Sequence, residues 1–160
     1  MTEEKLIETH INEVLNGGSK RLALDFIAFL RANAITPEQH ESGDGWSLVH
    51  KGESIGFIIV SQSEFPGPWT LWFNSCEFGS GESVSDDLKE TAWKHASTCG
   101  HFLSNGKECG CGDQPGFTRI IFGKEFQNRC HSPLMFHNPD ACIMESAKKL
   151  MLMLTKNMAA

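Results

Sequence analysis

The stretch WSLVHKGESIGFIIV, from Trp46 to Val60, has the pattern of a β-hairpin. Apolar residues alternate with other residues on both sides of Lys51-Gly52, and a period of two is typical of a strand with one buried face. A two-residue connection that ends in glycine is typical of the tight turn between antiparallel strands. We therefore expect two antiparallel strands, Trp46–His50 and Glu53–Val60.

Further strands are expected on both sides of a long central segment. Pro66-Gly67-Pro68 breaks the chain after the hairpin, and the alternation that follows predicts a third antiparallel strand beside the first two. The run FTRIIF is rich in β-branched and aromatic residues and is followed by Gly123. The expected strands are 69–73, 117–122 and a short element at 134–136.

Four segments have the apolar period of helices, and the first, third and fourth begin at a residue suited to a helix start. They run from Thr2 to about Leu15, from Lys20 to Asn33, from Ser83 or Ser85 to Thr98 or Cys99, and from Asn138-Pro139-Asp140 onward. The order is helix, helix, three strands, helix, strand, helix. We therefore predict one α+β domain over residues 1–160, with an antiparallel sheet of four to five strands and helices mainly on one face.

Composition narrows the classes of function. Apolar residues make up 40% of the chain and charged residues 21%, which is typical of a globular protein. The formal net charge of −6 does not favour binding to nucleic acid, because the affinity for phosphate comes from excess Lys and Arg. The acidic start MTEEK does not have the pattern of a signal peptide, and no apolar run is long enough to span a bilayer. We expect a cytoplasmic protein without a membrane or nucleic-acid partner.

Three short motifs near the C-terminal end of the chain are similar to motifs in a known group of proteins. They are FGKEFQNRC at Phe122–Cys130, NPD at Asn138–Asp140 and KKL at Lys148–Leu150. This part of the chain resembles an uncharacterised family of small bacterial proteins. The resemblance implies a bacterial protein of similar fold, and it implies no activity.

Cysteine and histidine gather around a glycine-rich segment. In a reducing cytosol the six cysteines are expected to be free thiols, so metal binding, thiol chemistry or packing must explain them. If the third helix reached Cys99, His95 and Cys99 would project from one face of it, a spacing that offers two ligands to one metal. The candidate ligands, among which the two histidines compete for one place, are His95, Cys99, His101, Cys109 and Cys111.

Zinc is the metal that such ligands favour, because thiolate and imidazole groups suit tetrahedral zinc. A closed site with four protein ligands would be structural. Two other interpretations stay open: the cysteines could be small buried apolar residues, or they could carry thiol chemistry.

Aromatic residues cluster around the Pro-Gly-Pro break and on the neighbouring strands. One interpretation is an apolar ligand pocket between the sheet and the helices, and the other is a core rich in aromatic side chains. Trp72 is opposite in phase to Trp69 along the third strand. The candidate ligand-binding residues are Trp46, Trp69 and Trp72.

Taken together, the patterns favour a non-catalytic binding or regulatory module that takes a small apolar ligand or a protein partner, with a structural zinc site in the Cys- and Gly-rich segment. The alternative is a thiol- or metal-dependent enzyme. No phosphate-binding glycine loop, G-x-S-x-G motif or H-E-x-x-H motif occurs in the sequence.

Overall fold

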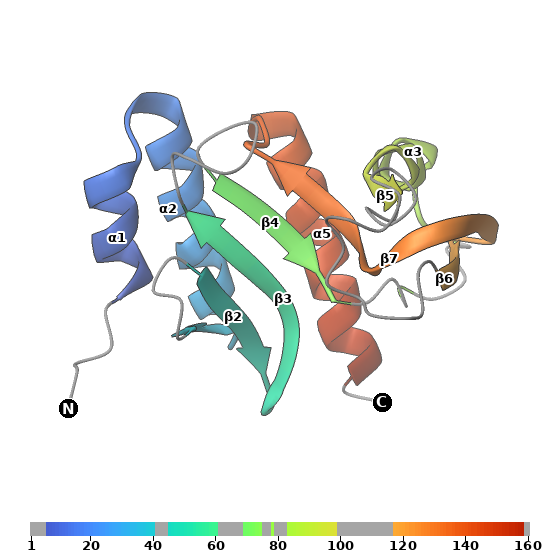
Figure 1. Cartoon of the computed structure of the whole chain (residues 1–160), viewed down its shortest axis with the longest axis horizontal. Coiled ribbons are helices and arrows are strands. Elements are labelled where there is room, and N and C mark those ends of the chain that lie inside the picture. Colours follow the sequence, from blue (N-terminus) through green and yellow to red (C-terminus); the bar gives the residue numbers. More distant parts are fainter. Residues whose placement is uncertain are drawn as a thin grey trace.

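The computed structural model describes residues 6–40, 45–60, 69–74, 78, 83–98 and 117–158, with the backbone alone at 97–98, 117, 128–133 and 157–158. Four helices are described: α1 (Ile7–Val14), α2 (Gly17–Ala32), α3 (Asp86–Lys94) and α5 (Ala141–Met158). The strands are β1 (Thr36–Gln39), β2 (Gly45–His50), β3 (Glu53–Val60), β4 (Trp69–Phe73), β5 (Ala96–Thr98), β6 (Phe117–Ile121) and β7 (Lys124–His137). The α+β class and the predicted order of elements are confirmed, with β1 and β5 as additional short strands (Figure 1).

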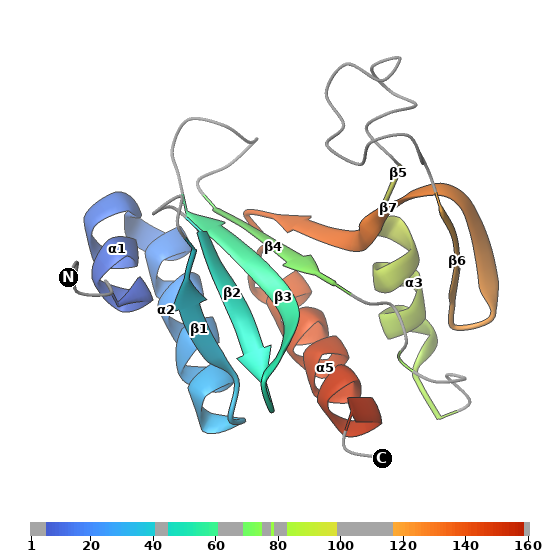
Figure 2. The same ribbon diagram turned by 60° about the horizontal axis from the view of Figure 1, so that its bottom comes forward.

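The strands form one antiparallel sheet in the order β1-β2-β3-β4-β7-β5, and β6 pairs with β7 outside this path. The long strand β7 serves two partners. Its C-terminal end, Leu134–His137, pairs with β4, and its N-terminal half pairs with β6. Between the two it bends away from the rest of the sheet, so the β6–β7 hairpin stands to one side (Figure 2).

The predicted hairpin is confirmed as β2 and β3, together with its turn. Lys51 and Gly52 have φ angles of 51° and 79°, and two successive positive φ values define the turn whose twist matches that of antiparallel strands. The same geometry recurs at Phe122 and Gly123, which join β6 to β7 with φ angles of 48° and 79°. Glycine at the second position of each turn adopts a positive φ angle without a steric penalty, so both turns form at little conformational cost.

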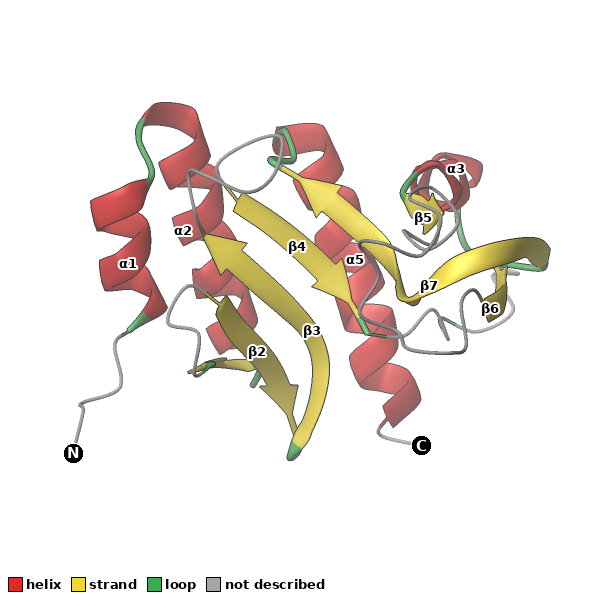
Figure 3. Cartoon of the chain, viewed as in Figure 1, coloured by secondary structure: helices red, strands yellow, loops and turns green. Residues whose placement is uncertain are grey.

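Helices α1, α2 and α5 cover one face of the sheet (Figures 1 and 3). On α1, Nε2 of His10 lies 2.9 Å from the carbonyl oxygen of Val60 in β3. On α2, the ring of Phe26 lies 6.3 Å from that of Trp69 in β4. The buried apolar side chains between these layers form the core and supply most of its stabilisation, because apolar burial is the dominant favourable term in folding.

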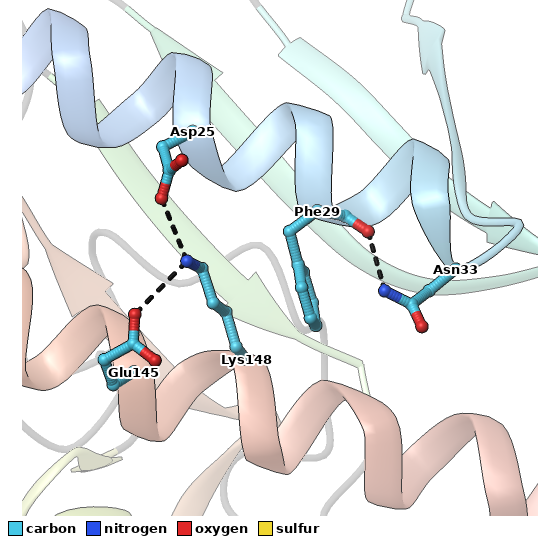
Figure 4. Close-up of polar contacts among 5 residues, drawn as sticks. All are labelled: Asp25, Phe29, Asn33, Glu145 and Lys148. Carbon is cyan, nitrogen blue, oxygen red and sulfur yellow. Dashed lines mark hydrogen bonds and ion pairs between the residues drawn. The ribbon is translucent and has the colours of Figure 1, made fainter.

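Ion pairs on the helix surfaces align the helices with one another. Arg31 of α2 donates to both carboxylate oxygens of Glu8 in α1, at 2.9 and 2.8 Å. Lys148 of α5 reaches Asp25 of α2 at 3.0 Å and Glu145 at 3.3 Å, and its Nζ lies 5.6 Å from the ring centroid of Phe29 (Figure 4). Such exposed pairs contribute up to about 1 kcal/mol each, so they orient helices that the core already holds.

The starts of two helices differ from those predicted. α2 begins at Gly17 rather than Lys20, while the expected start of the first helix at Thr2 lies outside the described residues. Pro37 lies in β1, where an edge strand tolerates a residue without an amide hydrogen. α5 is capped by Asp140, whose Oδ1 accepts from the amide of Ile143 at 2.9 Å, so its start shifts two residues beyond Asn138.

The third helix is shorter than predicted, which bears on the metal hypothesis. α3 is capped by Ser85 as expected, but it ends at Lys94 instead of reaching Thr98 or Cys99. The residues that follow form β5, in which Ala96 pairs with Leu134 of β7. Pairing with a distant strand thus overrides the helical period that continues through this stretch of sequence.

Within the described parts of the chain, no helix is both long and apolar enough to cross a membrane.

We predict that Gly56→Ala destabilises the fold by about 1–3 kcal/mol, because overpacking a filled interior costs that much. A Cβ atom at Gly56 would lie 2.7 Å from the carbonyl oxygen of Trp72, a backbone atom that cannot move alone. Urea unfolding measures the change. Gly18→Ala is the matched control, since nothing lies within 4 Å of a Cβ there, and equal stability of the two variants would contradict the prediction.

Candidate functional site

Most of the predicted metal ligands lie outside the described residues. These are Cys99, His101, Cys109 and Cys111. His95 is described, and it follows the last residue of α3. Because α3 ends at Lys94, His95 and Cys99 do not share a helix, and the predicted helical spacing of these two ligands is wrong.

His95 has a structural role at the end of α3. Its Nδ1 lies 2.8 Å from the carbonyl oxygen of Thr91. Since a carbonyl only accepts, Nδ1 carries the proton and the bond satisfies one of the last carbonyls of the helix. The imidazole also stacks on Phe136 of β7, with ring centroids 4.6 Å apart and an interplanar angle of 25°. Among the residues that the structure describes, no three His, Cys, Asp or Glu side chains gather as a metal site requires.

Two of the three tryptophans singled out from the sequence belong to the core. Trp46 is 1% exposed and packs against the ring of His10 at 4.9 Å. Trp69 is 2% exposed and packs against Phe26. Both lie on the face of the sheet that α1, α2 and α5 cover, so they fill the space in which a pocket between sheet and helices was one interpretation.

Trp72 lies on the opposite face. In β4 it alternates with the buried Leu71 and Phe73, and it remains partly exposed. Its ring meets that of Phe57 of β3 edge to face, with centroids 5.6 Å apart and an interplanar angle of 84°. The structure therefore separates Trp72 from Trp46 and Trp69 by the thickness of the sheet.

Strand register brings further apolar side chains to the face of Trp72. Phe57 pairs with Trp72, and Trp72 pairs with Met135 of β7, so the three form one row across the sheet. Ile59 lies two residues after Phe57 on the same strand, and residues two apart share a face. We call this group the aromatic platform; its members, all partly exposed, are Phe57, Ile59, Trp72 and Met135.

Gly45 provides the space for the ring of Phe57. A Cβ atom at Gly45 would lie 2.5 Å from Cζ and 2.8 Å from Cε1 of this ring, so the ring lies directly over the glycine. The imidazole of His40 also meets Phe57 edge to face, with centroids 5.7 Å apart. Phe57 therefore packs against Gly45, His40 and Trp72.

Thr70 and His137 form the polar side of the platform. They are register partners in β4 and β7, and Oγ1 of Thr70 lies 3.0 Å from Nδ1 of His137. Thr70 is fully buried although it lies on the face that bears Trp72. Burial, and secondly the charge of His95, lower the pKa of His137 below its ordinary value. His137 is thus mostly neutral at physiological pH.

Charged side chains are sparse on this face. Glu38 of β1 pairs with Ser47, which lies in the same row as Phe57, so it stands at the rim of the platform. The described strand residues that share this face include no Lys and no Arg. The platform is therefore an apolar surface with neutral hydrogen-bonding groups beside it.

The platform residues could have been identified from the alternation of side chains along the strands alone. Phe57 and Trp72 alternate with Ile58 and Leu71, and two large aromatic side chains out of phase with a buried face indicate a second apolar face. The contributions of Gly45, His40 and His137 depend on pairing between strands far apart in sequence, for which the sequence carries no local signal.

We predict that His137 makes the fold sensitive to acid. Because the folded pKa is depressed, the unfolded chain takes up a proton first as the pH falls. The contribution of His137 to stability is therefore fully present above pH 6.5, the ordinary pKa of histidine. It declines as the pH falls below this value toward the lower pKa of His137 in the folded protein. Urea unfolding between about pH 8 and about pH 5 should show a smaller loss for His137→Gln than for the wild type, and equal losses would contradict the assignment.

Comparison of the chain with protein-family models, with curated proteins and with solved structures finds no match. The functional proposal therefore depends on the chemistry and the placement of the residues described above.

Proposed function

We propose that the protein is a non-catalytic binding module whose aromatic platform takes a small, uncharged aromatic molecule. The observation that carries the proposal is the position of Trp72 and Phe57 on the face that α1, α2 and α5 leave uncovered, in edge-to-face contact at 5.6 Å. Apolar side chains on such a face cost solubility, and gathered in one place they are typical of a binding surface.

The charges around the platform favour an uncharged ligand. An anionic ligand needs Lys, Arg or protonated His, and His137 has a lowered pKa that keeps its ring neutral. A cationic ligand would gain from Glu38, but that residue is exposed at the rim, where a single charge in water contributes little. An aromatic ring laid on the platform would meet the edges and faces of Phe57 and Trp72 in the geometries that aromatic pairs prefer.

The size of the platform favours a small molecule over a protein. A stable protein interface takes about 800 Å² from each partner. Each of the four platform side chains is already partly buried, so together they expose far less area than that. A small ligand needs only a few apolar contacts and a few polar groups that fix its orientation, and the exposed His137, whose ring contacts Thr70, is one such group beside the platform.

The test measures binding of N-phenyl-1-naphthylamine, an uncharged aromatic probe whose fluorescence rises in apolar sites. We expect Trp72→Ala to weaken binding by about tenfold, which corresponds to about 1.4 kcal/mol of lost contact. Phe29→Ala is the matched control, because Phe29 is also a partly buried aromatic residue but lies on α2, on the far side of the sheet.

Circular dichroism of each variant checks that it is folded. Saturable binding to the wild type that Trp72→Ala reduces and Phe29→Ala does not would support the proposal. Absence of saturable binding to the wild type, or an equal loss in both variants, would overturn it.

A second candidate function is a zinc site that pins the Cys- and Gly-rich segment and stabilises the module. The observation that favours it is the register of the two strands that flank this segment. Thr98, at the end of β5, and Phe117, at the start of β6, both pair with Arg129 of β7. The two residues that flank the segment are therefore register partners of the same residue of β7.

The zinc proposal predicts about one zinc ion per chain in protein purified without chelator or metal-affinity resin. Cys109→Ser should lower both the zinc content and the thermal stability, because metal binding contributes to folding free energy. Cys142→Ser is the control, since Cys142 is a free, exposed cysteine of α5. Elemental mass spectrometry and thermal unfolding decide between the outcomes, and metal-free wild-type protein would exclude the site.

A further inference from the structure

We propose that Asn16 is a site of spontaneous deamidation, at which the folded protein converts an uncharged amide into a carboxylate at the joint between α1 and α2. Asparagine is one of the thermolabile residues of proteins. Its lability depends on the residue that follows it and on the contacts of its side-chain amide. Asn16 is followed by Gly17, and both residues are exposed. The inference is independent of the binding functions proposed above.

The contacts of the asparagine side chains single out Asn16. It occupies the cap position of α2, where an asparagine oxygen commonly accepts from the helix, yet its side chain makes no capping hydrogen bond. The other asparagines whose side chains the structure describes each have a hydrogen bond to the side-chain amide, and none is followed by glycine. They are Asn12, Asn33, Asn74 and Asn138.

The backbone nitrogen that attacks the amide is also accessible. Gly17 is the first residue of α2, and the first amide groups of a helix have no partner within it. Asn16 has φ and ψ angles of −135° and 157°, so its own backbone is extended and lies outside the helix. A Cβ atom at Gly17 would meet no described atom within 4 Å. The peptide group between the two residues therefore has room to turn toward the side chain.

The reaction needs only water. The backbone nitrogen of Gly17 loses its proton and attacks Cγ of Asn16, the bond between Cγ and Nδ2 breaks, and the amide leaves with that proton as ammonia. The product is a cyclic imide. Water then opens the ring: attack at Cγ gives aspartate, and attack at the backbone carbonyl carbon gives isoaspartate, in which the main chain runs through the side-chain carbonyl. No atom is oxidised or reduced.

The two products affect the fold in opposite directions. The first turn of α2 has no acidic residue, so aspartate at the cap places a negative charge at the positive end of the helix, where it is stabilising. Isoaspartate lengthens the main chain directly after Leu15, which is 1% exposed in the core. The added backbone carbon therefore strains the joint between two packed helices, and the isoaspartate form should unfold at a lower concentration of urea than the aspartate form.

Peptide mapping by mass spectrometry tests the inference on the folded, full-length protein during incubation at mildly alkaline pH. A synthetic peptide of residues 13–20 is incubated alongside. Asn16 of the protein should react within about tenfold of the rate in the peptide, because tenfold is only about 1.4 kcal/mol of activation free energy. The fragments that contain the four hydrogen-bonded asparagines are internal controls and should stay intact.

An isoaspartyl methyltransferase provides a second measurement, since it transfers a methyl group from S-adenosylmethionine to isoaspartate. Labelling of the fragment that contains residue 16 should be lost in Asn16→Ser, which has no amide to release. Asn33→Ser is the matched control and should retain the labelling. Circular dichroism checks that each protein is folded during the incubation.

Conversion of Asn16 ahead of the four other asparagines, with labelling that only Asn16→Ser removes, would support the inference. An Asn16 that stays intact in the folded protein while the peptide is consumed would overturn it, and so would equal conversion of the control asparagines. If Asn16→Ser does not fold, the peptide map of the wild type decides alone.

Discussion

The two-residue alternation of side chains across β2, β3, β4 and β7 is the constraint on which the rest of the structure depends. Register pairs Ser47 with Phe57, Phe57 with Trp72 and Trp72 with Met135, so a single phase governs four strands at once. The residues in one phase, which include Trp46 and Trp69, lie on the face of the sheet that α1, α2 and α5 cover. The residues in the other phase, which include Phe57 and Trp72, lie on the opposite face. A slip of one residue would exchange the two sets, and a buried core makes such a slip prohibitive.

Local patterns predicted the elements whose signals are local. The hairpin of β2 and β3 is specified by Lys51-Gly52, where two positive φ angles suit glycine in second place, and by the alternation of apolar residues on both sides, which a register shift between Leu48 and Val49 interrupts. The apolar period of the last segment was also sufficient to predict α5, although the cap of this helix is Asp140 rather than Asn138. In both cases the decisive residues lie within a few positions of each other.

The elements that the sequence did not predict depend on distant partners. β1 contains Pro37, which is compatible with a strand only because β1 lies at the edge of the sheet. β5 continues an apparently helical stretch, and it becomes a strand because β7 offers it a partner at Leu134. The same is true of the candidate site. The phase of Trp72 was visible in the sequence, whereas the room that Gly45 leaves for Phe57 and the contact of Thr70 with His137 depend on pairing.

The most direct test of the two-faced sheet is ¹⁹F NMR of protein that carries fluorotryptophan at all four tryptophans, with resonances assigned by single Trp→Phe variants. Exchange from H₂O to D₂O shifts only resonances of rings that meet solvent. The resonance of Trp72 should shift and those of Trp46 and Trp69 should not, because only Trp72 lies on the partly exposed face. A solvent shift at Trp46 or Trp69, with none at Trp72, would contradict the account.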